Sequence, residues 1–103
     1  MASCMRIISR KRLRQFWENP KYFDAEQPLK AWFREASKAT WANPLVVKAM
    51  YRSASIVGNS RVVFNIAGNK YRLVVQVNYA YQIIYVRFVG THQQYDQIDV
   101  TEV

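Results

Sequence analysis

The stretch RVVFNIAGNKYRLVVQVNYAYQIIYVRFVGTHQQYD, residues 61–96 of this 103-residue chain, decides the fold. It contains three apolar segments of strand length in tandem, rich in β-branched and aromatic residues. Gly68-Asn69 separates the first two segments and suits a two-residue hairpin turn, because glycine supplies the positive φ of the first central position. We therefore expect an antiparallel hairpin in which Asn65 faces Arg72.

The second hairpin is expected to turn over residues 78–81, a loop without glycine. This loop would pair Val75 with Ile84 and Arg72 with Arg87. One face of the sheet is then continuously apolar and should pack against helices: Val62, Phe64, Ile66, Tyr71, Leu73, Val75, Ile84, Val86 and Phe88. The other face carries a polar row, which Arg61, Lys70 and Gln76 extend: Asn65, Arg72 and Arg87. A slip of one residue would turn Arg87 into the core, where an unpaired charge is costly.

The segment before residue 61 predicts helices that cover the apolar face. Ser9 is placed to cap a helix that begins at Arg10, and Asp24 to cap a second helix with Pro28 in its first turn. The second helix carries a buried stripe at helical spacing: Leu29, Trp32, Phe33, Ala36 and Thr40. A further turn should follow Asn43-Pro44, residues 51–60 are expected to be a loop, and Arg6–Ile8 is expected to be an edge strand. The predicted fold is α+β, with N-terminal helices packed on one face of a small antiparallel β-sheet.

Length and composition predict one domain over residues 1–103. Met5 is a candidate natural start, in which case residues 1–4 are an upstream extension or a cloning remnant. Cys4 is the only cysteine, which excludes an internal disulfide and fits a cytoplasmic location. One cysteine and one histidine cannot form a structural zinc site, so we expect neither metal nor cofactor. No apolar run is long enough to span a membrane, and no secretory signal is recognisable.

The charge distribution indicates a polyanionic partner. The chain carries 15 Lys and Arg against 7 Asp and Glu, a net charge of +8. Residues 36–95 hold seven of the basic residues and no acidic residue. Such one-sign patterning suits a nucleic acid or an acidic protein partner, and the alternative is a basic surface that is merely solvated.

The expected pairing of Arg72 with Arg87 would place like charges side by side, which is unfavourable unless an anion neutralises them. A bound phosphate would do so through forked guanidinium contacts. Two alternatives stay open: both side chains extend into water, or a distant carboxylate reaches them, from Asp96, Asp99 or Glu102.

The segment after the last strand adds the only histidine of the chain. Thr91 and Gln94 have the spacing of a capping box, so a helical turn should start at His92. Antiparallel geometry places His92 near Lys70, and Tyr95 lies one helical turn further on. An imidazole suits proton transfer and arginines stabilise a phosphate in metal-free RNA cleavage, although a lone histidine is more often structural.

Other conspicuous residues have simpler explanations. Helical spacing indicates that Trp17 and Trp32, and with them Trp41, fill the core. Three tyrosines could stack on bases, but tyrosine is a common strand residue: Tyr79, Tyr81 and Tyr85. The basic cluster of residues 10–14 is more often a solvated helix face than a site for RNA phosphates or an acidic partner.

Two segments carry a resemblance to a known family: FNIAGNKYRLVVQVNY at residues 64–79 and IIYVRFVGTHQQYD at residues 83–96. Together they resemble the HigB family of bacterial toxins, within the RelE-like group of type II toxin–antitoxin systems. The matching positions are Phe64-Asn65, Gly68-Asn69, Tyr71-Arg72-Leu73, Arg87, Thr91-His92 and Tyr95-Asp96. The resemblance covers nearly all of residues 5–99 and implies a RelE-like toxin fold.

The resemblance also implies a function. Such toxins are ribosome-dependent mRNA endoribonucleases that inhibit translation and are neutralised by a HigA antitoxin with a helix-turn-helix domain. The resemblance implies four residues in the catalytic site: His92 for proton transfer, Arg72 and Arg87 on the phosphate, and Tyr95 as an orienting group. Five more are expected to contact RNA: Arg61, Asn65, Asn69, Lys70 and Asp96. Two alternatives stay open, a non-catalytic RNA- or ribosome-binding module and a subunit that docks an acidic protein.

Overall fold

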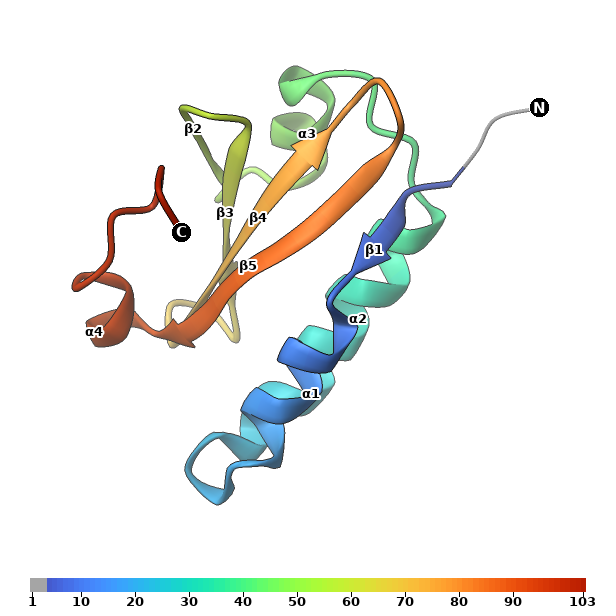
Figure 1. Cartoon of the computed structure of the whole chain (residues 1–103). Helices are drawn as coiled ribbons and strands as arrows, with labels where there is room; N and C mark the ends of the chain where they lie inside the picture. Colours follow the sequence, from blue (N-terminus) through green and yellow to red (C-terminus); the bar gives the residue numbers. More distant parts are fainter. Residues whose placement is uncertain (1–3) are drawn as a thin grey trace.

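The computed structural model describes residues 4–103, so the predicted extension at residues 1–4 lies outside the described part except for the exposed Cys4. The elements follow one another as β1 Arg6–Ile8, α1 Arg10–Glu18, the 3-10 helix η1 Pro20–Ala25, α2 Glu26–Lys38, α3 Pro44–Met50, β2 Ser55–Val57, β3 Arg61–Ile66, β4 Tyr71–Asn78, β5 Ile83–Thr91 and α4 His92–Tyr95. The strands form one sheet in the order β1-β5-β4-β3-β2. Figure 1 shows α3 and α4 near opposite ends of β5. No helix in the described part is long and apolar enough to cross a membrane.

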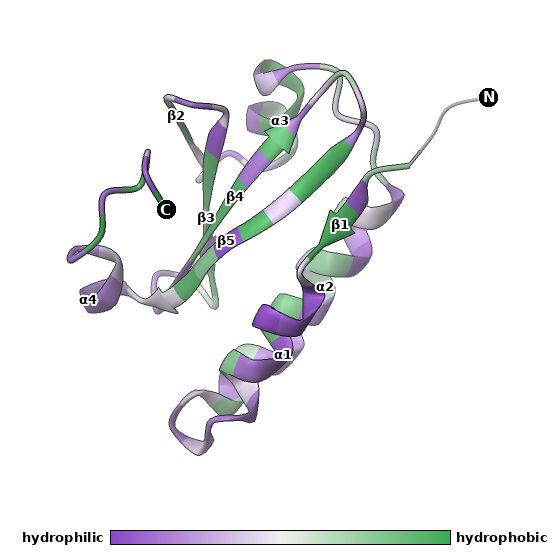
Figure 2. Cartoon of the chain, viewed as in Figure 1, coloured by the Kyte–Doolittle hydropathy of each residue, from purple (hydrophilic) through white to green (hydrophobic). Residues whose placement is uncertain are grey.

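The α+β architecture is confirmed, with one difference in the sheet. β1 is an edge strand as predicted, but it pairs with β5 in parallel, so the sheet is mixed rather than antiparallel. Helices α1, α2 and α3 each bury apolar side chains in the same core cluster as the sheet. Apolar residues follow the central strands and hydrophilic residues dominate α1 (Figure 2). The helices therefore cover one face of the sheet. On the other face Val63 and Val74 are also buried, and Arg61 donates to the carbonyl of Val103 near the C-terminus.

The first hairpin has the predicted register, with Asn65 opposite Arg72 and Ile66 opposite Tyr71. Its turn is closed by the Lys70 amide, which donates to the Ala67 carbonyl at 3.3 Å. Gly68 adopts the expected positive φ of 69°. The alanine before it, Ala67, also lies in the left-handed region, with a φ of 54°.

The second hairpin turns one residue later than predicted. β4 continues to Asn78, which faces Ile83, and the loop spans residues 79–82. Gln82 takes the positive φ, 57°, that a glycine would usually supply. The predicted pairing of Val75 with Ile84 is therefore wrong, because Val77 faces Ile84 instead.

A β-bulge in β5 causes a second departure from the predicted register. Val86 faces Val75 and Phe88 faces Val74, which leaves Arg87 as the additional residue. The predicted pairs of Arg72 with Arg87 and Tyr71 with Phe88 are wrong, since Gly90 and Thr91 occupy those positions. The bulge also changes the faces: Phe88 leaves the predicted core face and Val89 packs against the core instead.

The rest of the predicted core face is buried as expected. At its centre the Phe64 ring lies 5.4 Å from Trp32, 6.0 Å from Trp41 and 4.9 Å from Tyr51, measured between ring centroids. The prediction that Trp32 and Trp41 fill the core is confirmed, and Trp17 is partly buried against it.

The helix boundaries are close to those predicted, but two caps are not. Ser9 has a left-handed φ of 76° and its side chain caps nothing, while Asp24 precedes α2 without capping it. Pro28 does lie in the first turn of α2. Asn43 accepts from the Val46 amide at 3.2 Å and caps α3 as expected. β2 was missed because it is only three residues long and lies within the predicted loop.

Candidate active site

The end of β5 is hydrogen-bonded to the start of β4, and these bonds position His92. The capping box is present: the Gln94 amide donates to Thr91 Oγ1 at 3.1 Å, and the Thr91 amide donates to Gln94 Oε1 at 2.9 Å. The His92 amide donates to the Lys70 carbonyl at 3.3 Å. Both predictions, a helical turn from His92 and its place beside Lys70, are confirmed.

His92 lines a hollow of about 280 Å³, called here the histidine hollow. Its lining residues come from η1, both hairpin strands and α4: Lys21, Tyr22, Asn69, Lys70, Tyr71, Thr91, His92 and Gln93. The imidazole Nδ1 lies 3.4 Å from Asp96 Oδ2, one helical turn away, and the side chain is half-exposed. The imidazole makes no side-chain hydrogen bond in residues 4–103, so Nε2 is open to a substrate.

Lys70 is bonded to Asp24, a residue that the sequence analysis expected only to cap a helix. The Asp24 carboxylate accepts from the Lys70 ammonium on one oxygen and from the Tyr71 hydroxyl on the other. The bond from Lys70, followed by that from Tyr71, lowers the pKa of Asp24. The same bond raises the pKa of Lys70, so its ammonium stays charged beside the histidine hollow. Burial, followed by the bond to Asp24, raises the pKa of Tyr71.

The two predicted arginines share the face of the sheet opposite the helices but lie at different levels. Arg72 donates to the Asn69 carbonyl at 3.0 Å, and its guanidinium carbon lies 6.0 Å from the centre of the Tyr95 ring. Arg87 donates twice to Gln76 Oε1, at 3.1 and 2.6 Å. The bulge separates their positions by about two residues along the strands, or roughly 7 Å. No carboxylate in residues 4–103 forms an ion pair with either guanidinium.

The predicted RNA contacts divide into two groups. Asn69 and Lys70 line the histidine hollow, and Asn65 lies opposite Arg72 on β3. Arg61 is not brought to the site: its side chain is buried, and its two terminal nitrogens donate to the carbonyls of Asn59 and Val103 at 2.8 and 2.6 Å. Two of the three carboxylates that could have reached the arginines have other partners. Asp96 pairs with His92 and Asp99 accepts from Thr101.

A second hollow of about 410 Å³ lies between α1 and β5, and we call it the α1–β5 groove. Its lining residues are Arg12, Gln15, Phe16, Asn19, Tyr22, Arg87, Phe88 and Val89. Arg12 donates to the Arg87 carbonyl at 2.7 Å at the point where β1 has ended and β5 has an open edge. Tyr22 lines this groove and the histidine hollow, so the two spaces adjoin.

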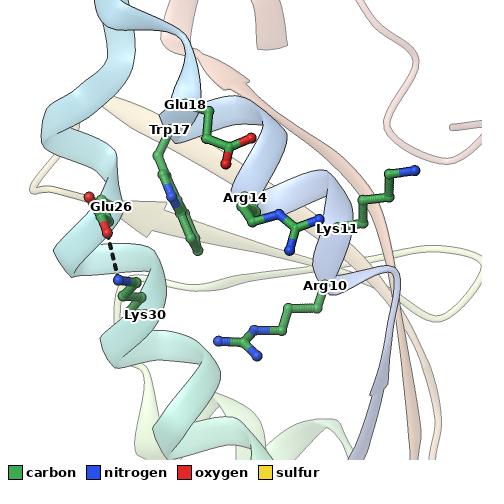
Figure 3. A pocket seen from close by; sticks show the side chains of 7 residues that line it. All are labelled: Arg10, Lys11, Arg14, Trp17, Glu18, Glu26 and Lys30. Carbon is green, nitrogen blue, oxygen red and sulfur yellow. Dashed lines mark hydrogen bonds and ion pairs between the residues drawn. The ribbon is translucent and has the colours of Figure 1, made fainter.

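The basic cluster of residues 10–14 is divided between two surfaces. Arg12 belongs to the α1–β5 groove, while its neighbours line a third hollow of about 460 Å³ between α1 and α2 (Figure 3). That hollow also contains carboxylates: its lining residues are Arg10, Lys11, Arg14, Trp17, Glu18, Glu26 and Lys30. Lys30 is paired with Glu26 at 2.5 Å, and Arg10 lies 4.7 Å above the Phe33 ring of α2. The hollow is thus partly neutralised by its own residues.

The described residues contain no group of three His, Cys, Asp or Glu side chains that could hold a metal ion. The chemical groups at this end of the sheet are an imidazole near a carboxylate and a charged ammonium at the histidine hollow, with a guanidinium and a phenol in the neighbouring Arg72–Tyr95 pair. This combination can bind a phosphodiester and transfer protons to and from its oxygens.

Comparison with known proteins agrees with this arrangement. Residues 25–98 match the model of the HigB toxin family, described as the RelE-like toxic component of a toxin-antitoxin system. The chain is 32% identical over 94 residues to the mRNA interferase toxin HigB of Escherichia coli K12. The alignment covers 89% of this chain and 88% of the relative. The mRNA interferases HigB of Escherichia coli O157:H7 and Shigella flexneri match with the same identity and the same coverage. The chain therefore belongs to the HigB toxin family, whose members are RelE-like toxic components of toxin–antitoxin systems.

Proposed function

We propose that this chain is an mRNA interferase, an endoribonuclease that inhibits translation by cutting mRNA. The observation that carries the proposal is the histidine hollow, which His92 and Lys70 both line, with the Arg72–Tyr95 pair on residues next to it in β4 and α4. The names of the relatives support the same activity. A purely structural role would not require a half-exposed imidazole beside a permanently charged ammonium.

The reaction that this site suits is attack of a ribose 2′-hydroxyl on the adjacent phosphorus. The 2′-oxygen–phosphorus bond forms and the phosphorus–5′-oxygen bond breaks, giving a 2′,3′-cyclic phosphate and a free 5′-hydroxyl. One proton leaves the 2′-hydroxyl and another is delivered to the 5′-oxygen. His92 performs one of these transfers through Nε2.

The cationic side chains stabilise the negative charge that develops on the phosphate oxygens. Lys70 is fixed by Asp24 and remains protonated, while Arg72 lies against Tyr95, which orients the nucleotide. Arg87 lies about two residues further along the sheet and therefore binds a neighbouring phosphate rather than the reacting one. Asn65 and Asn69 provide amide contacts to the same strand of RNA.

Membership of a toxin–antitoxin family implies an antitoxin partner. We infer that this partner is a HigA-like protein with a helix-turn-helix domain, that the substrate is mRNA on the ribosome, and that the reaction takes place in the cytoplasm. Purified chain tested on free and on ribosome-bound mRNA distinguishes the substrates, and cleavage that is equally fast on free mRNA would contradict ribosome dependence.

The activity is tested by inducible expression of the wild type, His92→Ala and Arg72→Ala, with primer extension on cellular mRNA. Arg52→Ala is the matched control, because Arg52 is an exposed arginine on the turn after α3. We expect growth arrest and cleavage from the wild type and the control, and neither from the two site variants. Growth arrest without cleavage in the wild type would favour a non-catalytic ribosome-binding module instead.

A further inference from the structure

We propose that the α1–β5 groove is the subsite that receives the nucleobase next to the scissile phosphate and sets the sequence preference of cleavage. The inference rests on the proposed ribonuclease function and extends it to Gln15, Asn19 and Phe88, which no motif indicated. The groove adjoins the histidine hollow at Tyr22, whose hydroxyl accepts from Gln94 Nε2 at 3.3 Å. A nucleotide in the groove would therefore be separated from a phosphate beside His92 by the Tyr22 side chain alone.

The groove combines the three kinds of group that recognition of an unstacked base requires. It has a cationic end with Arg12 and Arg87, amide side chains from α1, and an aromatic wall that includes Phe88. Its volume of about 410 Å³ leaves room for a base together with part of its ribose. Few other ligands need cations, amides and aromatic rings together in so small a space.

The bulge at Arg87 creates the aromatic wall. Without it, Phe88 would point into the core, as the uninterrupted register predicts. With it, Phe88 faces the buried Val74 on the side opposite the helices, and it packs against no other aromatic ring in the described residues. Gly90 makes room for the Phe88 ring. The methyl group of an alanine at position 90 would lie 2.6 Å from the ring, so the ring lies over a residue without a side chain. Phe88 is half-buried and lines the groove, where a base would stack on its ring.

The amide groups of the groove have unused hydrogen-bonding capacity. Asn19 accepts from the Lys21 amide through Oδ1 at 3.0 Å, which leaves its NH₂ group as a donor. Gln15 is exposed and its amide has no partner in the described part of the chain. Residues of this type read base edges by paired donors and acceptors. Gln15 and Asn19 are therefore the specificity-determining pair.

The arginines likewise keep free donors for a phosphate. Arg12 uses Nη1 on the Arg87 carbonyl, and Arg87 uses Nε and Nη2 on Gln76. A guanidinium carries five N–H donors, so each side chain retains some for an RNA backbone. The bond from the Arg12 side chain to the Arg87 carbonyl also joins α1 to β5 at the bulge.

The test measures binding of a single-stranded RNA trinucleotide whose 2′-hydroxyls are replaced by hydrogen, so that it cannot be cut. We expect Phe88→Ala to weaken binding about five- to hundredfold, as loss of one stacked base does. Phe88→Trp should keep the affinity, and Phe88→Leu, which preserves the apolar bulk, should lose it. Circular dichroism of each variant checks that the sheet is intact.

A matched pair of arginines on α1 controls for charge. Arg12→Ala should weaken binding and Arg14→Ala should not, because Arg14 faces the hollow between α1 and α2. With cleavable mRNA, Gln15→Ala should change the distribution of cut sites while total cleavage persists. Unchanged affinity in both Phe88→Leu and Phe88→Ala, or equal losses in Arg12→Ala and Arg14→Ala, would overturn the subsite.

The outcomes separate this inference from the function on which it rests. Binding that depends on Phe88 in a chain that cuts no mRNA would support the groove and refute the nuclease. Cleavage that depends on His92, with cut sites and affinity indifferent to Phe88 and Gln15, would support the nuclease and refute the groove. Loss of antitoxin binding in Phe88→Ala with RNA affinity intact would assign the groove to a protein and also refute the subsite.

Discussion

Removal of the hydroxyl of Thr91 should misplace His92 without unfolding the protein. Thr91→Val keeps the branched shape of a strand residue but deletes the oxygen that accepts from the Gln94 amide at 3.1 Å. Loss of such a cap costs about 1 kcal/mol, which corresponds to about a fivefold change in an equilibrium constant. Helix α4 has only four residues and no further turns to compensate, so the cost falls on the segment that positions the imidazole.

Hydrogen exchange measured by NMR gives the most informative assay. The Gln94 amide should exchange about fivefold faster in Thr91→Val, and mRNA cleavage should fall by a similar factor. The midpoint of thermal unfolding should decrease by no more than about 8 °C, the upper value for about 1 kcal/mol in a domain of this size. Thr91→Ser retains the hydroxyl and should behave as wild type. Unchanged exchange and cleavage in Thr91→Val, or an equal loss in Thr91→Ser, would refute the positioning role of the capping box.

Three further predictions concern stability and charge. The folded-state pKa of Asp24 is lowered below its ordinary value of 3.8. The bonds that its carboxylate accepts should therefore stabilise the fold above pH 3.8, and this stabilisation should be lost as the pH falls through the lower folded-state pKa. The difference in unfolding midpoint between the wild type and Asp24→Asn should disappear in strong acid, and a constant difference at every pH would contradict this. Phe64→Ala should lower the free energy of unfolding in urea by about 3–5 kcal/mol because the ring is fully buried among three aromatic neighbours, whereas Phe23→Ala, at a side chain that is 72% exposed, should change it by about 0.5 kcal/mol or less. The slope of log affinity for single-stranded RNA against log salt concentration should become less steep by about 0.7 in Arg87→Ala, and an unchanged slope would show that Arg87 binds no phosphate.

The part of the fold that depends on local chemistry could be predicted from the sequence. Gly68 identifies the first hairpin turn, and the alternation around it determines which residues face the core. The end of the second hairpin could not be placed, because a glutamine, Gln82, occupies the left-handed position that a glycine would have marked. The bulge at Arg87 has no sequence signal either, since it depends on how β5 fits between β4 and α1.

The same distinction applies to the candidate site. The place of His92 beside Lys70 follows from antiparallel geometry and a capping box, both of which are visible in the sequence. The bond between Asp24 and Lys70 joins residues 46 positions apart, and the sequence suggested only a helix cap for Asp24. The α1–β5 groove depends on the path of α1 along an open strand edge, which tertiary packing decides.

The chemistry of the RNA ends produced by the purified chain is the decisive measurement for a nuclease site at the junction of β4, β5 and α4. Ribosome-bound mRNA is incubated with the wild type or with His92→Ala, and the new 3′ ends are mapped with and without removal of a cyclic phosphate. We predict 2′,3′-cyclic phosphate ends from the wild type and none from His92→Ala. Ends of the same kind and amount from both proteins would place the reaction elsewhere in the molecule.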